Sequence, residues 1–170
     1  MFKRIAVAFL ATCVPVAANA ASPTVTRDVV YGHKDGLAMT FDVIQPDDAN
    51  GVGLLFMVSG GWFSQWFPPE FVIRKDPPQQ PNSFEAVVDR GFTLFLVRHG
   101  SAPKYKVPDA VADVRRAVRY VRLNSRKFAV DPDRLGVFGG SAGGHLSLML
   151  GTTSDDGTPT PMDPVAGTSC

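Results

Sequence analysis

The sequence predicts an α/β fold in which a mostly parallel sheet carries helices on both faces. Short apolar runs separated by turn residues alternate with helical segments along the chain. Two of these runs are continuously apolar, as in central strands that are covered on both sides. Of the 170 residues 45% are hydrophobic, which is enough for the core of one domain.

The first twenty residues have the three zones of a secretory signal peptide. A basic pair, Lys3 and Arg4, precedes an apolar stretch and a small-residue sequence that ends at Ala20. The apolar stretch is too short to span a bilayer, which takes about 20 residues in a helix. We therefore expect export to the periplasm or the extracellular space, with 21–170 as a mature domain that has no membrane span. Lipid attachment at Cys13 is the minor alternative.

Removal of this leader would leave 15 basic and 16 acidic residues. A net charge so close to zero gives no general attraction to a polyanion, so nucleic acid is not an expected partner. The mature chain would keep Cys170 as its one cysteine and could form no internal disulfide, so its stability must come from the core.

Four strands are expected in the first hundred residues. Residues 25–31 and 39–44 suit an antiparallel edge, joined by a turn over Gly32–Gly36. Residues 53–58 and 92–97 are the continuous apolar runs and suit the centre of the sheet. A crossover connection must join these two central strands.

Two helices are expected before the next strand. A short one covers Ser83–Arg90 in the crossover, and Gly91 ends it. The longest covers Asp109–Lys127 after Pro108, and its apolar stripe consists of Val111, Val114, Val118 and Val121. Its other flanks carry Arg115, Arg116, Arg119 and Arg122. We interpret these arginines as a solvated face with local ion pairs to Asp109 and Asp113.

The segment after this helix carries the chemistry. An apolar strand over 134–139 runs directly into a helix, and the turn between them fits the G-x-S-x-G nucleophile elbow: Gly139-Gly140-Ser141-Ala142-Gly143. Such a reversal forces strained backbone at its centre, which small neighbours make possible, and projects the Ser141 hydroxyl above the sheet. A phosphate-binding loop is disfavoured, because His145 and Leu146 stand where lysine and serine or threonine would be needed.

A second glycine turn follows the first central strand. Ser59-Gly60-Gly61-Trp62 occupies the loop that, in hydrolases with a nucleophile elbow, supplies one backbone donor of the oxyanion hole. The other donor would be the N–H of Ala142 at the start of a helix. A plain structural turn is the alternative for this loop.

Residues 29 to 156 resemble α/β-hydrolases of the esterase and lipase type, nearest to the feruloyl and acetyl xylan esterase-like branch, which is related to the prolyl oligopeptidase catalytic domain. Four segments carry the resemblance: Ser59 to Trp62, Val97 to Ser101, Asp113 to Arg122 and Gly139 to His145. It implies an α/β-hydrolase fold, Ser141 as nucleophile, and oxyanion donors from Ala142 and from Gly61 or Trp62. Many relatives have a loop-stabilising histidine where this chain has Ser59, so that role is absent or replaced.

The implied mechanism is acyl transfer in two steps, and its acid and base should follow the nucleophile in the chain. After Ser141 the sequence has one histidine, His145, which lies one helical turn on and resembles a packing residue of the family. His99 precedes the nucleophile and suits a hydrogen bond within its loop, while His33 falls in the hairpin turn. Asp155, Asp156 and Asp163 come too soon after the elbow helix to be the triad acid.

The triad acid and base are therefore expected to be absent from this chain. We expect 21–170 to be the N-terminal part of a hydrolase domain, truncated after the elbow helix and inactive or weak by itself. No metal or cofactor is expected, and the partner is a small-molecule or carbohydrate-linked ester. A non-catalytic fragment or pseudoenzyme and a prolyl oligopeptidase-like peptidase are the alternatives, and the sequence leaves the oligomeric state open. The aromatic and proline-rich segment 62–82 suits either a substrate rim or a self-packed loop.

Overall fold

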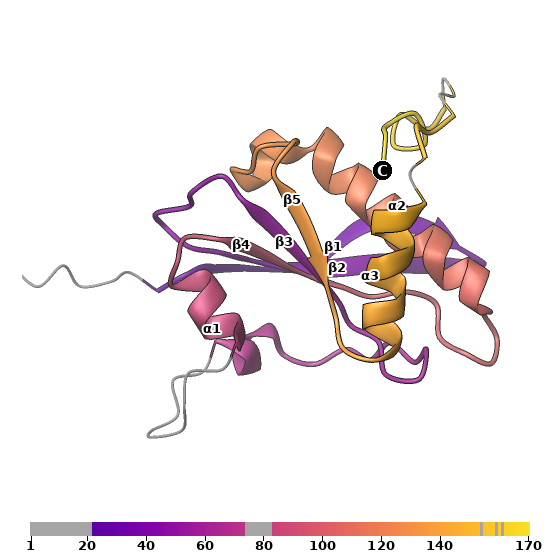
Figure 1. The fold of residues 1–170 in the computed structure, drawn as a ribbon, viewed down its shortest axis with the longest axis horizontal. Helices are drawn as coiled ribbons and strands as arrows, with labels where there is room; N and C mark the ends of the chain where they lie inside the picture. The colour runs from indigo at the N-terminus through magenta and orange to yellow at the C-terminus, as the bar shows by residue number, and fades with distance from the viewer. Residues whose placement is uncertain (1–21, 74–82, 154, 159, 161) are drawn as a thin grey trace, which may run out of the picture.

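The computed structural model describes residues 22–73, 83–153, 155–158, 160 and 162–170, so the expected signal peptide lies outside it. A sheet of five strands forms the centre of this part of the chain (Figure 1). The strands are β1 (Thr24–Lys34), β2 (Leu37–Gln45), β3 (Gly53–Met57), β4 (Thr93–Val97) and β5 (Leu135–Phe138). The helices are α1 (Ser83–Val88), α2 (Val107–Leu123) and α3 (Ala142–Thr152), with short 3₁₀ turns η1 (Pro69–Val72) and η2 (Ser125–Phe128). None of the helices in these ranges is long and apolar enough to cross a membrane.

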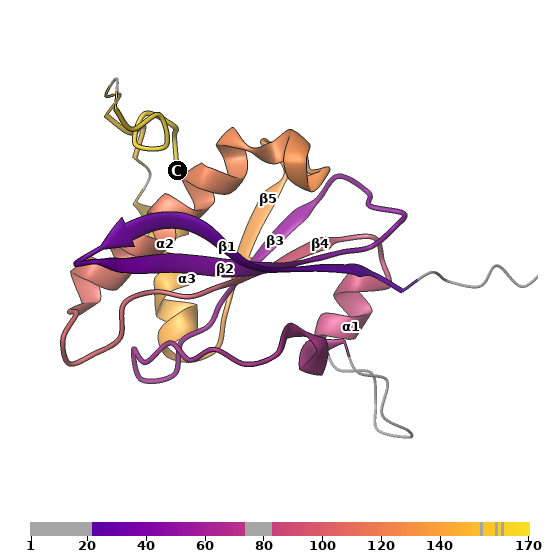
Figure 2. The ribbon, with the colours of Figure 1, turned by 180° about the vertical axis from the view of Figure 1, so that it is seen from behind.

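The sheet is mixed, with strand order β1-β2-β4-β3-β5. β1 and β2 form an antiparallel hairpin at one edge, and β2 continues antiparallel to β4. β4, β3 and β5 run parallel, and β5 is the other edge. Every predicted strand is present within a few residues, and the hairpin stands at the edge as expected (Figure 2).

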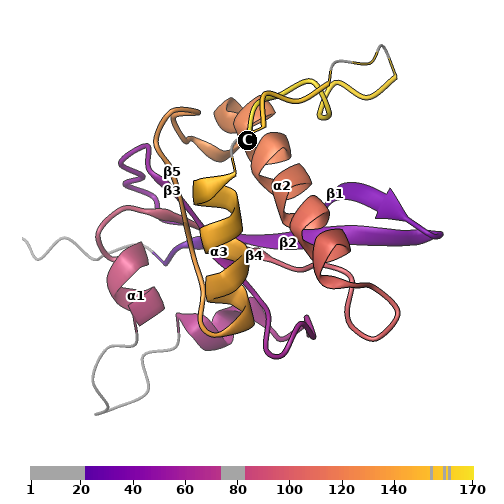
Figure 3. The same ribbon diagram turned by 45° about the vertical axis from the view of Figure 1, so that its right-hand side comes forward.

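The helices cover both faces of the sheet, as predicted. The chain crosses from β3 to β4 in one direction along the sheet and from β4 past β3 to β5 in the other. Because such crossovers are right-handed, connections in opposite directions lie on opposite faces. α1 therefore packs on one face, while α2 and α3 lie side by side on the other (Figure 3).

Each face has its own core. Under α2 and α3 the ring of Phe41 is fully buried and contacts four other rings at centroid distances from 5.6 to 6.0 Å: Tyr31, Phe95, Tyr120 and Phe128. The predicted valine stripe of α2 is buried against this cluster. Under α1, Phe84 meets Phe56 and Phe138 at 4.8 and 6.0 Å, which fixes the short helix to β3 and β5.

The hairpin turn is shorter than predicted. β1 continues to Lys34 and β2 begins at Leu37, so Asp35 and Gly36 form a two-residue turn, with φ of 50° and 79°. A two-residue turn with positive φ at both positions matches the right-handed twist of the flanking strands, and Asp-Gly is a preferred sequence for it. The expectation that His33 lies in the turn was therefore wrong: it is an exposed residue of β1.

The predicted long helix is divided in two. α2 begins at Val107 and ends at Leu123, and η2 follows it. Asp109 accepts the N–H of Lys106 at 2.8 Å and caps the first turn. Ala129, with φ of 50°, ends η2 in the left-handed conformation, so the helix cannot continue into β5.

The arginines of α2 bind the C-terminal segment, which corrects the interpretation of a solvated face with local ion pairs. Asp113 lies on the buried side of the helix, where its carboxylate forms an ion pair with Lys34 at 2.6 Å. It is therefore not the ion-pair partner of these arginines. The four arginine side chains instead reach along the flank to the last twenty residues, where their partners are Thr153, Asp155, Asp163 and Ser169.

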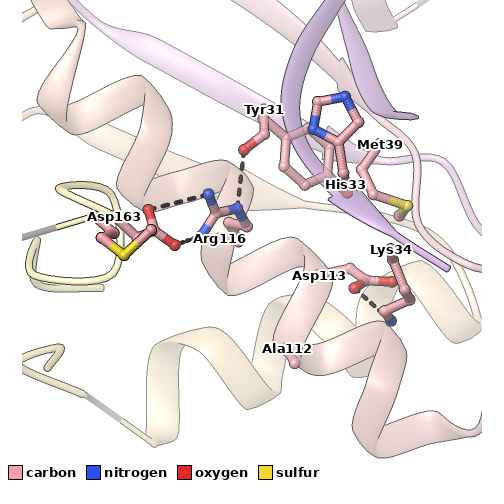
Figure 4. A pocket seen from close by; sticks show the side chains of 9 residues that line it. Tyr31, His33, Lys34, Met39, Ala112, Asp113, Arg116 and Asp163 are labelled. Atoms are coloured by element: carbon pink, nitrogen blue, oxygen red, sulfur yellow. Dashed lines mark hydrogen bonds and ion pairs between the residues drawn. The ribbon is translucent and has the colours of Figure 1, made fainter. Parts of the chain in front are cut away.

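Arg116 holds the most extensive of these contacts (Figure 4). Its guanidinium donates to both carboxylate oxygens of Asp163, at 2.6 and 3.1 Å, and to the carbonyl oxygen of Tyr31 at 3.0 Å. A Cβ at Gly32 would lie 2.5 Å from the Arg116 Nε, so a glycine there leaves room for the guanidinium against β1. One side chain thus joins α2, the hairpin and the C-terminal segment.

A buried ion pair fixes the hairpin to the centre of the sheet. Asp42 is fully buried in β2, and its carboxylate accepts from Arg98 at 2.6 Å and from the Asp28 N–H at 2.8 Å. Arg98 follows β4 directly, and its guanidinium also donates to the hydroxyl of Thr40 at 2.8 Å. The charge of Asp42 is therefore paired and hydrogen-bonded, as a buried carboxylate requires.

Candidate active site

The two glycine turns singled out in the sequence lie at one edge of the sheet. β3 and β5 are parallel neighbours, with Phe56 paired to Phe138, so their carboxyl ends meet. From there the chain passes to α1 on one face after β3, and to α3 on the opposite face after β5. Neighbouring strands whose connections leave toward opposite faces open a crevice between them, and in open α/β sheets ligands bind in such crevices.

Ser141 stands at the corner between β5 and α3. Its backbone has φ of 50° and ψ of −118°, and the residue is exposed. A non-glycine residue in this region costs about 1 to 3 kcal/mol, which the surrounding structure must overcome. β5 ends at Phe138 and α3 begins at Ala142, so a turn of three residues joins the strand to the helix, as the motif predicts.

The glycines around Ser141 differ in how much space a side chain would have. A Cβ on Gly139 would lie 2.6 Å from the backbone carbon of Gly143, and a Cβ on Gly143 would lie 2.5 Å from the Met57 carbonyl oxygen. Both contacts are with backbone atoms, which, unlike a side chain, have no other rotamer that would relieve the clash. A Cβ on Gly140 would meet nothing within 4 Å. Close packing within the elbow and against β3 thus explains glycine at positions 139 and 143, where the G-x-S-x-G pattern requires it, and not at position 140.

The predicted oxyanion donors belong to two segments, the start of α3 and the turn after β3. Ala142 is the first residue of α3, and among the described residues its N–H has no hydrogen-bond acceptor. The loop after β3 makes a tight turn in which Phe63 donates to Gly60 at 3.0 Å. The two central residues, Gly61 and Trp62, have φ of 56° and 62°, and their N–H groups likewise lack an acceptor in the part of the chain described.

A ring contact joins the glycine turn after β3 to α3. Trp62 packs edge-to-face on His145 of α3, with ring centroids 5.9 Å apart. His145 therefore faces the glycine turn and makes no hydrogen bond with the Ser141 side chain among the described residues. This agrees with a packing role for His145.

His99 makes two side-chain hydrogen bonds in the loop after β4. Its Nδ1 lies 2.8 Å from the Gly100 carbonyl oxygen, and its Nε2 lies 2.8 Å from the Ser59 Oγ. A carbonyl oxygen only accepts, so Nδ1 carries the proton, and in the neutral ring Nε2 accepts from the hydroxyl of Ser59. Burial lowers the pKa of His99 below its usual value, although the Gly100 carbonyl and the nearby Asp113 act in the opposite direction.

Ser64 and Ser101 continue the same junction between the two loops. Ser64 donates its N–H to the Ser101 Oγ at 2.9 Å and its hydroxyl to the Val58 carbonyl oxygen at 2.6 Å. Ala102 donates to the Trp62 carbonyl oxygen at 3.0 Å. The loop after β3 is therefore held along its length by the loop after β4.

The remaining candidate acids and histidines lie elsewhere. Asp155 and Asp163 pair with Arg119 and Arg116, and for both carboxyls the pKa is lowered. For Asp155 the chief cause is the Gly157 N–H, and for Asp163 it is Arg116. No contact with Ser141 is found for these carboxylates in the described ranges. They therefore act as loop residues, as expected.

Two cavities lie away from the elbow. One of about 490 Å³ lies between the hairpin, α2 and the C-terminal segment, and its lining includes Lys34, Arg116 and Asp163 (Figure 4). The other, of about 340 Å³, lies beside His99 and Tyr105. Ser141 lines neither of them, so they give no support to its role.

The proximity of Ser59 and His99 follows from the register of the two strands that precede them. Met57 of β3 is paired with Val97 of β4 in the parallel ladder. Ser59 and His99 each lie two residues beyond these partners, so equal steps from a paired position bring them side by side. Without knowledge that β3 and β4 are neighbours, this relation could not be drawn.

Comparison with known proteins identifies the family. Residues 42–164 match the BD-FAE family. The chain belongs to the BD-FAE family. Esterase LipQ of Mycobacterium tuberculosis (strain ATCC 25618 / H37Rv) is 29% identical over 134 residues, which are 77% of this chain and 30% of LipQ. The probable carboxylic ester hydrolase LipM of the same strain is 27% identical over 132 residues, 76% of this chain and 28% of LipM.

Solved structures agree with the fold of this BD-FAE chain. Native esterase Est2 of Thermogutta terrifontis has a TM-score of 0.62 at 25% identity, covering 88% of this chain and 51% of Est2. An acetyl ester-xyloside bifunctional hydrolase of Caldicellulosiruptor lactoaceticus has the same TM-score at 24% identity, covering 91% of this chain and 56% of that one. The predicted α/β-hydrolase fold of the esterase type is thereby confirmed. The chain spans about half the length of these structures and less than a third of LipQ and LipM.

Proposed function

We propose that Ser141 is the nucleophile of a carboxylic ester hydrolase that works through an acyl-enzyme. The observation that carries the proposal is the exposed, positive-φ Ser141 at the start of α3, with the loop after β3 beside it. Esterase relatives support ester hydrolysis at the level of the family. The backbone N–H groups of Ala142 and of Gly61 or Trp62 would hold the oxyanion.

The chemistry requires a base and an acid beyond the residues gathered here. A histidine takes the proton of Ser141 as its Oγ attacks the ester carbonyl, and the tetrahedral intermediate collapses to an acyl-enzyme that water then hydrolyses. Of the three histidines, His33 lies on the hairpin, His99 is engaged with Ser59 and His145 packs on Trp62. We therefore propose that the 170-residue chain by itself has little or no turnover.

The substrates we propose are small-molecule or carbohydrate-linked esters with short acyl groups. The structures of Thermogutta terrifontis Est2 with propionate bound, 27% identical to this chain, support a short acyl group. The segment from the glycine turn to η1 carries three exposed aromatic rings, Phe63, Trp66 and Phe71, which favour an apolar or sugar-binding rim.

Labelling of Ser141 with a fluorophosphonate tests the nucleophile. Est2 is phosphonylated by cyclosarin at 26% identity to this chain, which supports the choice of probe. In the form of the protein that includes the acid and base, we expect one label on the peptide that contains Ser141, and none after Ser141→Ala. Ser147→Ala is the matched control, since it removes a hydroxyl from the same helix that donates to Gly143 at 2.9 Å. Label on Ser141→Ala, or none on the unchanged protein, would refute the proposal.

A non-catalytic role of the isolated chain makes a separate prediction. Hydrolysis of p-nitrophenyl acetate by the purified 170-residue product should equal that of its Ser141→Ala variant. Turnover clearly above that control would show that the chain contains a working base, and His99 and His145 would then have to be tested.

We also propose that the protein is exported. The basic pair Lys3 and Arg4, the apolar stretch and the small residues up to Ala20 support it. Amino-terminal sequencing of the secreted product should begin at Ala21, and an intact Met1 on the folded protein would contradict cleavage.

A further inference from the structure

We propose that His99 and Ser59 are a positioning pair that fixes the turn carrying the oxyanion donors Gly61 and Trp62. This inference deepens the proposed function and rests on it for the role of the donors. The physical claim itself concerns the order of the loop, which can be measured without catalysis.

The hydrogen bond from Ser59 to His99 joins the ends of two neighbouring parallel strands. The two residues lie at equal distances beyond paired positions of β3 and β4, and Nε2 and Oγ are 2.8 Å apart. His99 is 5% exposed, and its ring is held from the other side by the Gly100 carbonyl oxygen. A rigid, buried acceptor thus meets the first residue of the loop.

The rest of the junction holds the residues on both sides of Ser59, while Ser59 itself is held by His99. Ala102 holds the turn itself through the Trp62 carbonyl oxygen, and Ser64 joins the two loops after the turn through the Ser101 Oγ. Before the turn, the Val58 N–H donates to the Val97 carbonyl oxygen as the last bond of the ladder, and the Val58 carbonyl oxygen accepts from the Ser64 hydroxyl at 2.6 Å. Between these anchors the Ser59 hydroxyl supplies a direct side-chain contact from the residue that enters the Gly60–Phe63 turn.

The turn needs such a constraint because its conformation is not the preferred one. Trp62 has φ of 62°, a left-handed backbone that costs a bulky residue more than it costs glycine. A loop without a fixed entrance could relax to another turn and move the two N–H groups away from the elbow. Since displacement of a catalytic group by about 1 Å can cost a hundredfold in rate, the constraint has a direct consequence for the site.

His99 acts through this contact and is not placed as the general base. Both of its ring nitrogens are occupied, by Gly100 and by Ser59. The charged groups that face the ring are Asp113 of α2, which also accepts the Gly100 N–H at 3.0 Å, and Lys34 of β1, which pairs with Asp113. Burial disfavours the charged ring, while these two charges act on it in opposite directions, and the neutral ring can accept from Ser59.

Two substitutions of His99 separate the two ring nitrogens. The side-chain amide of glutamine reaches the position of Nε2, and that of asparagine reaches the position of Nδ1. His99→Gln should therefore keep an acceptor for Ser59, while His99→Asn and Ser59→Ala should lose the contact. His33→Gln, on the exposed part of β1, is the control for replacing a histidine.

The decisive measurement is backbone ¹⁵N relaxation of the 170-residue chain. We expect order parameters at Gly61 and Trp62 of about 0.85 in the unchanged chain, His99→Gln and His33→Gln, and below about 0.6 in Ser59→Ala and His99→Asn. The amide shifts of β1 and β2 should stay the same in all five, which shows that the fold is retained. Ring ¹⁵N spectra should show His99 neutral, with its proton on Nδ1, and a shift of Nε2 in Ser59→Ala.

Several results would overturn the inference. Equal order of the turn in Ser59→Ala and in the unchanged chain would do so, as would a proton on Nε2, or His99→Gln as mobile as His99→Asn. In the form that reacts with fluorophosphonate, the labelling rate should fall about tenfold to a hundredfold in Ser59→Ala and His99→Asn and recover in His99→Gln. If Ser141 is never labelled, the proposed function fails while the relaxation result stands; if Ser141 is labelled at equal rates in all variants, the positioning role alone fails.

Discussion

Substitution by alanine should change the stability of the chain differently at the three glycines of the elbow, Gly139, Gly140 and Gly143. Alanine at position 143 would bring its Cβ to 2.5 Å from the Met57 carbonyl oxygen, whereas ordinary contacts lie at 3.4 to 4 Å. β3 or α3 would have to move by about 1 Å, and overpacking of this kind costs about 1 to 3 kcal/mol. Because the clash is with backbone, we expect Gly143→Ala and Gly139→Ala to lose about 3 kcal/mol of unfolding free energy.

Gly140 is the matched control in the same turn. Its Cβ would meet nothing within 4 Å, and its φ lies outside the left-handed region. Gly140→Ala should therefore be neutral or stabilise by about 0.4 to 1 kcal/mol, because alanine reduces the entropy of the unfolded chain.

Urea unfolding followed by circular dichroism measures this difference. With a slope of about 1 to 3 kcal/mol per molar urea, a loss of about 3 kcal/mol lowers the midpoint by roughly 1 to 3 M. Gly140→Ala should unfold at or slightly above the midpoint of the unchanged chain. If Gly140→Ala were destabilised as much as Gly143→Ala, or if Gly143→Ala were neutral, the close approach of the elbow to β3 would be refuted.

Three further predictions concern other parts of the chain. Asp42→Ala should lose about 3 to 5 kcal/mol of unfolding free energy in urea, because it leaves the Arg98 guanidinium without its buried partner, and a loss below about 1 kcal/mol would contradict the pairing. The carboxyl pKa values of Asp155 and Asp163 are lowered in the folded chain, so their contacts stabilise the C-terminal segment above the ordinary value of 3.8 and are lost as the pH falls below it. Relative to a small free thiol at the same pH, labelling of the half-buried Cys170 by 4,4′-dithiodipyridine in a Cys13→Ser background should become faster over that range, and in Arg116→Ala it should be fast even at pH 6. Trp66→Ala should impair hydrolysis of bulky esters and spare small ones in the form that turns over, and an equal loss for both would count against a substrate rim.

Local patterns in the sequence were enough to predict the elements that form the elbow. β5, Ser141 and α3 are contiguous in the chain, so their geometry depends on a few neighbouring φ values and small side chains. The valine stripe of α2 was equally visible, because a helix brings residues three and four apart onto one face. These predictions needed no knowledge of what packs against what.

Predictions that depended on distant partners were less successful. The arginines of α2 were predicted to form ion pairs with Asp109 and Asp113, their neighbours in sequence. In the structure their hydrogen bonds and ion pairs are with the segment 153–169. The burial of Asp113 explains the difference, because its carboxylate faces the core and forms an ion pair with Lys34 there. The hydrogen bond between Ser59 and His99 spans 40 residues and follows from strand register, which no local pattern reveals.

The position of Trp62 shows why the two turns must be considered as one site. Glycine would adopt its φ of 62° at lower cost, so the tryptophan has to gain from contacts that glycine cannot make. The contact that the structure provides is with His145, one turn into the helix that Ser141 begins. The ring thereby fixes the backbone of one candidate donor to the helix that carries the other, Ala142. Together with the approach of Gly143 to Met57 and the hydrogen bond between Ser59 and His99, this contact limits the movement of one candidate donor relative to the other.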